Sequence, residues 1–152
     1  MYAMDELKRD IYTQDPDFER NMRLGIPFGH ATRMAMFTRA ATELRTLAKQ
    51  HRHVLADEAL HLGIYRDFLR TTLAQDGLQS FFIWVHTSPS IAEERLLQPR
   101  AGHMLQANAL PMLRAMRLEC DSTQCIDATV HNDGPPDQTA RDVDRILSPL
   151  LV

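Results

Sequence analysis

The sequence predicts an α/β domain built on a parallel β-sheet. Its 152 residues are the length of one domain, and short apolar runs alternate along them with segments of helical periodicity. One run, Phe81-Phe82-Ile83-Trp84-Val85, is apolar at every position, which is typical of a strand that helices cover on both faces. Regular alternation of strands and helices favours a parallel sheet over an antiparallel one.

The expected elements follow from apolar spacing and from the residues that begin and end helices. Strands are expected at residues 1–4, 53–56, 81–85 and 126–130. Helices are expected at residues 5–13, 31–50, 64–76, 89–98, 105–119 and 138–147. Asp5, Ser88 and Asp137 are good N-cap residues, and Pro89 suits a first helical position. Residues 14–30 contain two prolines and two glycines and are expected to form a loop.

The composition of the chain argues against several classes of protein. The net charge of −3 gives no general attraction to nucleic acid or to an anionic membrane. Residues 1–10 carry five charged side chains and no apolar run reaches the length of a membrane span, so we expect a cytoplasmic protein without a signal peptide. Cys120 and Cys125 are too few for a disulfide framework or a four-ligand zinc site.

Candidate functional residues follow the carboxyl ends of the expected strands, where parallel sheets carry their chemistry. These residues are Asp5, Asp57 with Glu58, His86 with Thr87, and Asn132 with Asp133. The seven histidines form no His-Glu-x-x-His motif, and the closest pairs are His51-x-His53 and Glu58-x-x-His61. Neither spacing predicts a metal site.

The order of these segments resembles the P-loop small-molecule kinases, the group that includes gluconate kinase, chloramphenicol phosphotransferase and zeta-toxin-like enzymes. The matching segments are Tyr2-Ala3-Met4-Asp5-Glu6-Leu7 (second strand of the family), Val54-Leu55-Ala56-Asp57 (third strand), Phe82-Ile83-Trp84-Val85 (next strand), and Glu94-Arg95-Leu96 with Arg100 (lid, about 88–104). The resemblance covers nearly the whole chain. It implies a three-layer, P-loop NTPase-like parallel sheet flanked by helices, forming a single domain over residues 1–152.

The sequence departs from this family at its defining element. The first strand and the Gly-x-x-x-x-Gly-Lys-Ser/Thr (Walker A) loop should precede Tyr2, and none of the six glycines is followed by Lys. We therefore expect an N-terminally incomplete fold. The missing strand would lie between 53–57 and 81–86, so we also expect an open strand edge and a homodimer or aggregation across it.

The resemblance implies roles for five residues, each with a plainer alternative. Asp57 would bind Mg²⁺ or orient the attacking hydroxyl, or it caps the following turn. Asp5 would be a general base, or a helix N-cap. Arg95 and Arg100 would bind ATP phosphates and neutralise the transferred phosphoryl group, or they are helix-surface arginines. Arg66 falls where the family often has an arginine and would contact substrate.

The expected function is that of an ATP- and Mg²⁺-dependent phosphotransferase acting on a small hydroxylated metabolite or nucleotide. Without a Walker A loop, residues 1–152 are expected to be inactive in this reaction. The alternative is a non-catalytic remnant that acts as a binding or interaction module.

Overall fold

The computed structural model describes residues 2–98, 109–121 and 124–151 and is mostly helical within them. The helices are α1 (Asp5–Tyr12), α2 (Phe18–Leu24), α3 (His30–Ala48), α4 (Gly63–Ala74), α5 (Pro89–Leu97), α6 (Ala109–Glu119), α7 (Pro136–Leu147) and the 3-10 helix η1 (Ser148–Leu150). The strands are β1 (Tyr2–Ala3), β2 (Ala56–Asp57), β3 (Ile83–His86) and β4 (Ala128–His131). No described helix is long and apolar enough to cross a membrane.

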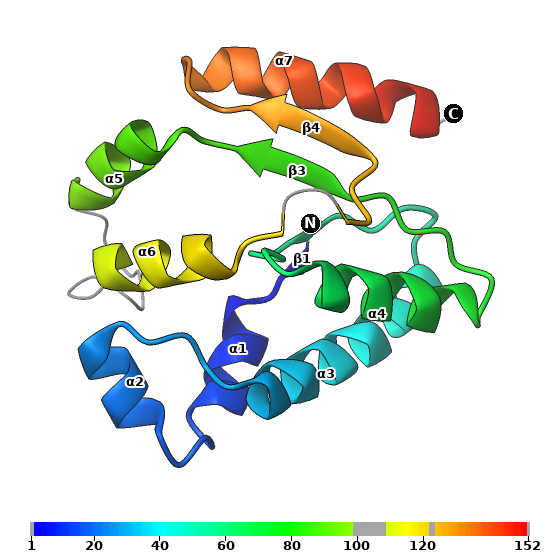
Figure 1. Cartoon of the computed structure of the whole chain (residues 1–152). Helices are drawn as coiled ribbons and strands as arrows, with labels where there is room; N and C mark the ends of the chain where they lie inside the picture. Colours follow the sequence, from blue (N-terminus) through cyan, green and yellow to red (C-terminus); the bar gives the residue numbers. More distant parts are fainter. Residues whose placement is uncertain (1, 99–108, 122–123, 152) are drawn as a thin grey trace.

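The four strands form two separate parallel pairs (Figure 1). In the first pair, Ala3 of β1 lies opposite Asp57 of β2. In the second pair, Ile83 of β3 lies opposite Ala128 of β4, and the register continues to the end of both strands. Within the described residues β2 does not pair with β3, so the two pairs do not join into one sheet.

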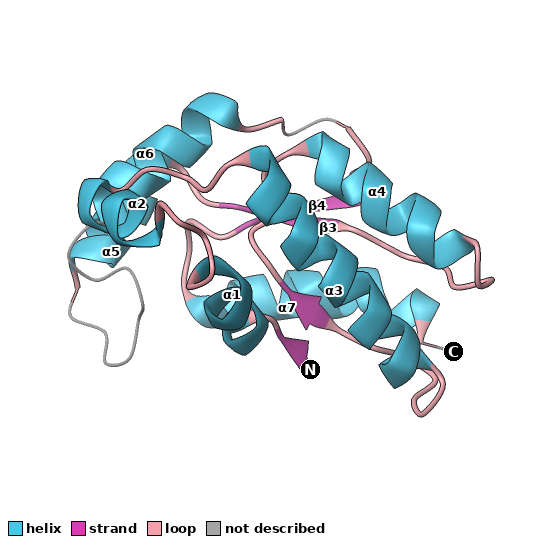
Figure 2. Cartoon of the chain, turned by 90° about the horizontal axis from the view of Figure 1, so that it is seen from below, coloured by secondary structure: helices cyan, strands magenta, loops and turns pink. Residues whose placement is uncertain are grey.

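The main core lies where α3 packs between α1 and α4 (Figure 2). Its buried residues are Met4, Leu7, Met36, Phe37, Ala40, Ala41, Tyr65 and Leu69. The side chains on α3 recur at intervals of one, three and four residues, which places them on one face of the helix. This core fixes α1, α3 and α4 relative to one another and thereby positions the polar side chains at their ends.

The β3–β4 pair is held between α7 and α4. In Figure 1, α7 runs alongside β4 on the side of the pair away from α3 and α4. On the other side, Arg70 of α4 donates a 2.5 Å hydrogen bond to the Asp127 carboxylate, and its guanidinium lies 5.1 Å from the centre of the Phe82 ring. Asp127 also accepts a hydrogen bond from the backbone N–H of Phe82 at 2.7 Å.

The prediction of a three-layer, P-loop NTPase-like parallel sheet is wrong. The structure is predominantly helical, and its parallel strands are confined to two pairs. The reason lies in the strands themselves: β1 and β2 have two residues each, and the side chains of Ala56 and Asp57 are exposed. A strand with one partner and no covering layer buries little apolar surface, which leaves little to stabilise further strand residues.

Three local predictions also need correction. Residues 14–30 contain helix α2, which ends where Gly25 adopts the left-handed conformation at φ 63°. A helix between Pro16 and Gly25 agrees with the usual placement of these residues near a helix start and just beyond a helix end. Asp5 is the first residue of α1 and Met4 is its N-cap, while α7 begins at Pro136 and therefore includes Asp137. Ser88 and Pro89 begin α5 as predicted.

Candidate functional site

The described residues that the resemblance predicts for the site belong to different elements. Asp57 ends β2 with an exposed side chain, and Asp5 begins α1. Arg95 belongs to α5, which covers the first part of the expected lid. Arg100 and the rest of the lid, residues 99–104, lie outside the described residues.

Arg95 holds a loop of the protein. Its Nη1 donates a 2.6 Å hydrogen bond to the carbonyl of Asn132, and its Nη2 donates a 3.0 Å hydrogen bond to the carbonyl of Gly134. These bonds attach α5 to the segment that follows β4. The guanidinium that was predicted to bind ATP phosphates therefore donates two hydrogen bonds to backbone carbonyls.

Arg66 is a buried structural residue, with 1% of its surface exposed. Its Nε donates a 2.8 Å hydrogen bond to the carbonyl of Gln124, and its Nη groups donate to the carbonyls of Leu60 and Asp121. The guanidinium also lies 5.7 Å from the centre of the Trp84 ring. Arg66 thus ties the segment after β2 to the segment after α6, and backbone carbonyls engage its Nε and both Nη groups.

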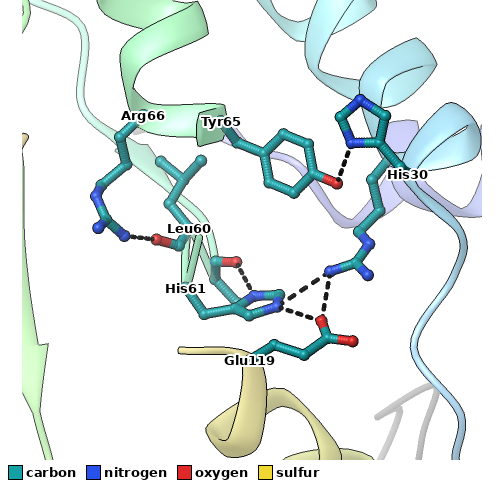
Figure 3. A network of polar contacts seen from close by, with 8 residues as sticks. His30, Leu60, His61, Tyr65, Arg66 and Glu119 are labelled. Carbon is teal, nitrogen blue, oxygen red and sulfur yellow. Dashed lines mark hydrogen bonds and ion pairs between the residues drawn. The ribbon is translucent and has the colours of Figure 1, made fainter. Parts of the chain in front are cut away.

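His61 in the first of these segments and Glu119 at the end of α6 belong to a polar cluster, shown in Figure 3, that also includes side chains of α3 and α4. We call it the Arg33 cluster and define it as Arg33, His61, Glu119, Tyr65 and His30. Arg33 Nη1 donates a 2.9 Å hydrogen bond to Glu119 Oε2 and lies 3.2 Å from His61 Nε2. His61 Nε2 lies 3.5 Å from the same carboxylate oxygen. The Tyr65 hydroxyl is 3.2 Å from His30 Nδ1.

Backbone contacts hold the cluster together. The N–H of Asp121 donates a 2.9 Å hydrogen bond to the carbonyl of His61, beside the carbonyls that Arg66 binds. His61 and Glu119 are therefore fixed relative to each other although they lie far apart in the sequence. Arg33 and Tyr65 come from α3 and α4, whose packing forms the core.

A second ion pair lies within electrostatic range of the cluster. Lys8 Nζ of α1 is 2.9 Å from Glu58 Oε2, and the Glu58 side chain is only 4% exposed. Burial of Tyr12 raises the pKa of its phenol, and the charge of Glu58 raises that pKa further, while Arg33 acts in the opposite direction. Tyr12 thus links the Lys8–Glu58 pair to the Arg33 cluster and remains a neutral hydroxyl at physiological pH.

The electrostatics of the cluster favour a neutral His61 and a charged Glu119. Burial and, to a smaller extent, the charge of Arg33 lower the pKa of His61, and together they exceed the opposing influence of the Ala59 carbonyl and Glu119. Burial alone would raise the pKa of Glu119, but the hydrogen bonds and charges of Arg33 and His61 lower it overall. The formal charges of Lys8, Arg33, Glu58 and Glu119 then sum to zero.

One donor of the cluster has no hydrogen-bond partner among the described residues. Arg33 Nε is buried and makes no hydrogen bond with the described residues, although the Arg33 side chain is 12% exposed as a whole. A buried donor left without an acceptor costs about 1–3 kcal/mol, so such groups are rare in folded proteins. Glu119, at 40% side-chain exposure, gives the cluster a face toward solvent.

Sequence reasoning missed most of this site, although part of the signal was present. Glu58 follows the predicted Asp57 at the end of β2, and it is Glu58 that is buried and ion-paired. Glu58-x-x-His61 did not predict a metal site, and the structure places the two residues in neighbouring ion-pair networks. Arg33 has no sequence signal of this kind because it stands within an ordinary helical repeat.

The described residues give little support to the Mg²⁺ and ATP that the resemblance implies. Arg95 is engaged by backbone carbonyls, and no group of three or more His, Cys, Asp or Glu side chains in the described ranges could hold a metal ion. The Arg33 cluster contains no Gly-rich turn whose N–H groups could surround phosphates. We therefore derive no phosphoryl-transfer step from this structure.

A surface pocket occurs elsewhere, with a volume of about 340 Å³. It is lined by Thr129, Val130, His131, Gln138, Asp142, Arg145 and Ile146 of β4 and α7. None of these residues belongs to the Arg33 cluster. Its two opposite charges, Asp142 and Arg145, already pair with each other at 3.0 Å. The Arg33 cluster therefore remains the stronger candidate for chemistry.

Comparisons with protein-family models, curated proteins and solved structures found no match for this chain. The functional argument consequently rests on the geometry of the Arg33 cluster and on the residues of this sequence.

Proposed function

We propose that this chain is a binding module for a small hydroxylated metabolite, which it holds at the Arg33 cluster. The observation that carries the proposal is the buried Arg33 Nε, which has no acceptor in the part of the chain that the structure describes, in a cluster that reaches solvent through Glu119. A ligand oxygen bound at Arg33 would complete the hydrogen bonding of that group.

The donor and acceptor set suits hydroxyl groups. The carboxylate of Glu119 accepts hydrogen bonds, and the guanidinium of Arg33 donates them, so each hydroxyl of a ligand can both donate and accept. The zero sum of the four charges near the site favours a ligand that is neutral or carries few charges, because a multiply charged ligand would gain no net attraction. A few convergent polar groups of this kind commonly fix the orientation of a small molecule.

This proposal corresponds to the non-catalytic alternative drawn from the sequence. The phosphotransferase activity implied by the resemblance stays a prediction, and in that case the bound metabolite would be the phosphoryl acceptor. The two functions differ in their need for Mg-ATP. Melting temperatures of the chain measured with and without Mg-ATP, in the absence of any metabolite, distinguish them.

The test is a thermal-shift series with D-glucose, myo-inositol, D-gluconate and adenosine at millimolar concentration. A ligand at about 100 times its Kd stabilises the folded chain by about 2.7 kcal/mol, which is readily measured. We expect at least one of these probes to raise the melting temperature, and the substitution Arg33→Gln to abolish that rise.

The matched control is Arg39→Gln on the same helix, because Arg39 is exposed and pairs with Glu43 away from the cluster. It should retain the ligand-induced shift. Circular dichroism of Arg33→Gln verifies that the variant is folded. Absence of a shift with every probe, or an equal shift in wild type and folded Arg33→Gln, would overturn the proposal.

A further inference from the structure

His61 stands between a donor and an acceptor, in an arrangement that depends on its protonation. Its Nδ1 lies 3.3 Å from the carbonyl of Ala59, so a neutral ring places its proton on Nδ1 and donates it to that carbonyl. Nε2 is then a lone pair facing Arg33 Nη1, which donates to it at 3.2 Å. The Glu119 carboxylate at 3.5 Å offers Nε2 no proton in this state.

Protonation of His61 reverses these preferences. An N–H at Nε2 would face the Arg33 donor, which is repulsive, and would point a proton toward Glu119 Oε2, which is attractive. We propose that His61 is a proton-dependent switch that takes the Glu119 carboxylate from Arg33 when it is protonated. The added proton alone changes the local charge from zero to +1, and the exchange frees the Arg33 guanidinium from Glu119.

Among the groups around His61, the transfer of the Glu119 carboxylate from Arg33 to His61 is the main change when His61 is protonated. Arg33 of α3 and Glu119 of α6 both face the imidazole ring of His61. The segment before the ring contributes the neutral carbonyl of Ala59. On α4, Tyr65 carries a buried phenol whose pKa burial raises, so it stays uncharged while His61 titrates. Burial also lowers the pKa of His61, which sets the switch below neutral pH.

The consequence for binding rests on the proposed function. With an added positive charge, the cluster should prefer a hydroxylated ligand that carries an acidic group, and this preference should grow as the pH falls. The switch therefore predicts that the cluster binds hydroxy acids and that it binds them more tightly in mildly acidic solution.

The switch is tested without any ligand, by following the imidazole signals of the chain by NMR during a pH titration. The His61 signal is assigned from its absence in His61→Asn. Relative to wild type, the pKa of His61 should fall in Glu119→Gln, which removes the acceptor of the new proton, and should rise in Arg33→Gln, which removes a repelling charge. Glu43→Gln, on the exposed face of α3, should leave it unchanged. Equal pKa values in all four proteins would refute the switch.

The binding consequence is tested by calorimetry with D-gluconate and D-glucose at pH about 7.5 and about 5.5. Coupling between protonation and binding should strengthen gluconate binding by about fivefold or more at the lower pH and leave glucose binding unchanged. Failure of D-gluconate, D-glucose and the other two probes to bind at either pH would contradict the proposed function, whereas the NMR result would still decide the switch. Gluconate binding of equal strength at both pH values would contradict the link between them.

Discussion

Gly63, at the start of α4, shows how closely the segments around the candidate site approach each other. A Cβ atom at this position would lie 2.4 Å from Gln124 Oε1, 2.6 Å from Asp121 Oδ2 and 2.7 Å from Gln124 Cβ. The first two atoms are the ends of side chains, but the third is close to the backbone of the segment that Arg66 holds. The absence of a side chain at Gly63 therefore allows the segment after α6 to pack on α4.

We predict that Gly63→Ala lowers the free energy of unfolding by about 1–3 kcal/mol, because the added methyl group displaces this segment. Helix propensity alone would make the alanine variant more stable by about 1 kcal/mol. The sign of the change in the free energy of unfolding therefore distinguishes the packing effect from helix propensity. The measurement is urea unfolding, with Gly29→Ala as control, since a Cβ at Gly29 meets nothing within 4 Å. A Gly63→Ala variant as stable as wild type would contradict the packing.

The stability of the chain should also depend on pH through His61. Burial lowers its pKa in the folded chain below the ordinary value of 6.5. The stabilisation is complete above pH 6.5 and is lost as the pH falls toward the lowered value, because the unfolded chain then takes up the proton first. The lowered pKa of Glu119 acts in the same direction at still lower pH.

Urea unfolding of wild type and His61→Gln at pH about 7.5 and about 5.5 measures this contribution. The loss of stability on acidification should be smaller in His61→Gln than in wild type. The other six histidines are common to both proteins, so the difference reports His61. Identical losses in the two proteins would show that His61 has the same pKa folded and unfolded.

At the scale of elements, the strands could be located from the sequence but their extent could not. The apolar runs at 81–85 and 126–130 correspond to β3 and β4, and they pair in parallel as predicted. The run at 53–56 is reduced to Ala56–Asp57, because no layer covers it and Leu55 is half exposed. Apolar character marks a possible strand, whereas the length of a strand depends on neighbours that a local pattern does not contain.

The open edge of β3 carries a prediction about association. Within the described residues β3 pairs with β4 alone, and Phe81 and Val85 are about half exposed. Unpaired backbone groups beside exposed apolar side chains are a template for strand addition. We expect the chain to dimerise or aggregate at high micromolar concentration, as measured by analytical ultracentrifugation.

The substitution Val85→Lys should suppress this association, since a charged side chain at a strand edge opposes further pairing. Leu97→Lys is the control, because Leu97 is also exposed but lies at the end of helix α5. A wild-type chain that stays monomeric, or equal suppression by both variants, would contradict association through β3.

At the scale of the whole molecule, the core and the candidate site differed in how far the sequence could predict them. Met34, Phe37, Ala41, Leu44 and Ala48 gave the helical period that became α3, and α3 does form the core with α1 and α4. The site was not predictable in the same way, because Arg33, His61 and Glu119 are joined only by tertiary contacts. Arg66 holds together the segments that adjoin His61 and Glu119, and nothing local to either residue indicates this contact.

The structure also predicts how the chain responds to a nucleotide. Because Arg95 donates to the carbonyls of Asn132 and Gly134, and the sequence has no Gly-Lys-Ser/Thr loop, Mg-ATP should not raise the melting temperature. Saturating Mg-ATP would otherwise stabilise the chain by about 2.7 kcal/mol at 100 times its Kd. A clear shift that Arg95→Ala abolishes would restore the predicted ATP-binding role of Arg95.

The central claim, that the Arg33 cluster binds a small hydroxylated metabolite, is tested most directly by mapping the ligand onto the chain. The measurement is a titration of isotopically labelled protein with D-gluconate, in which backbone amide and arginine side-chain signals are followed by NMR. The binding account predicts saturable shifts at Arg33 Nε and at the amides of His61 and Glu119, with those of β4 and α7 unchanged. Shifts confined to the β4–α7 pocket, or no saturable shift with this probe or the other three, would contradict it.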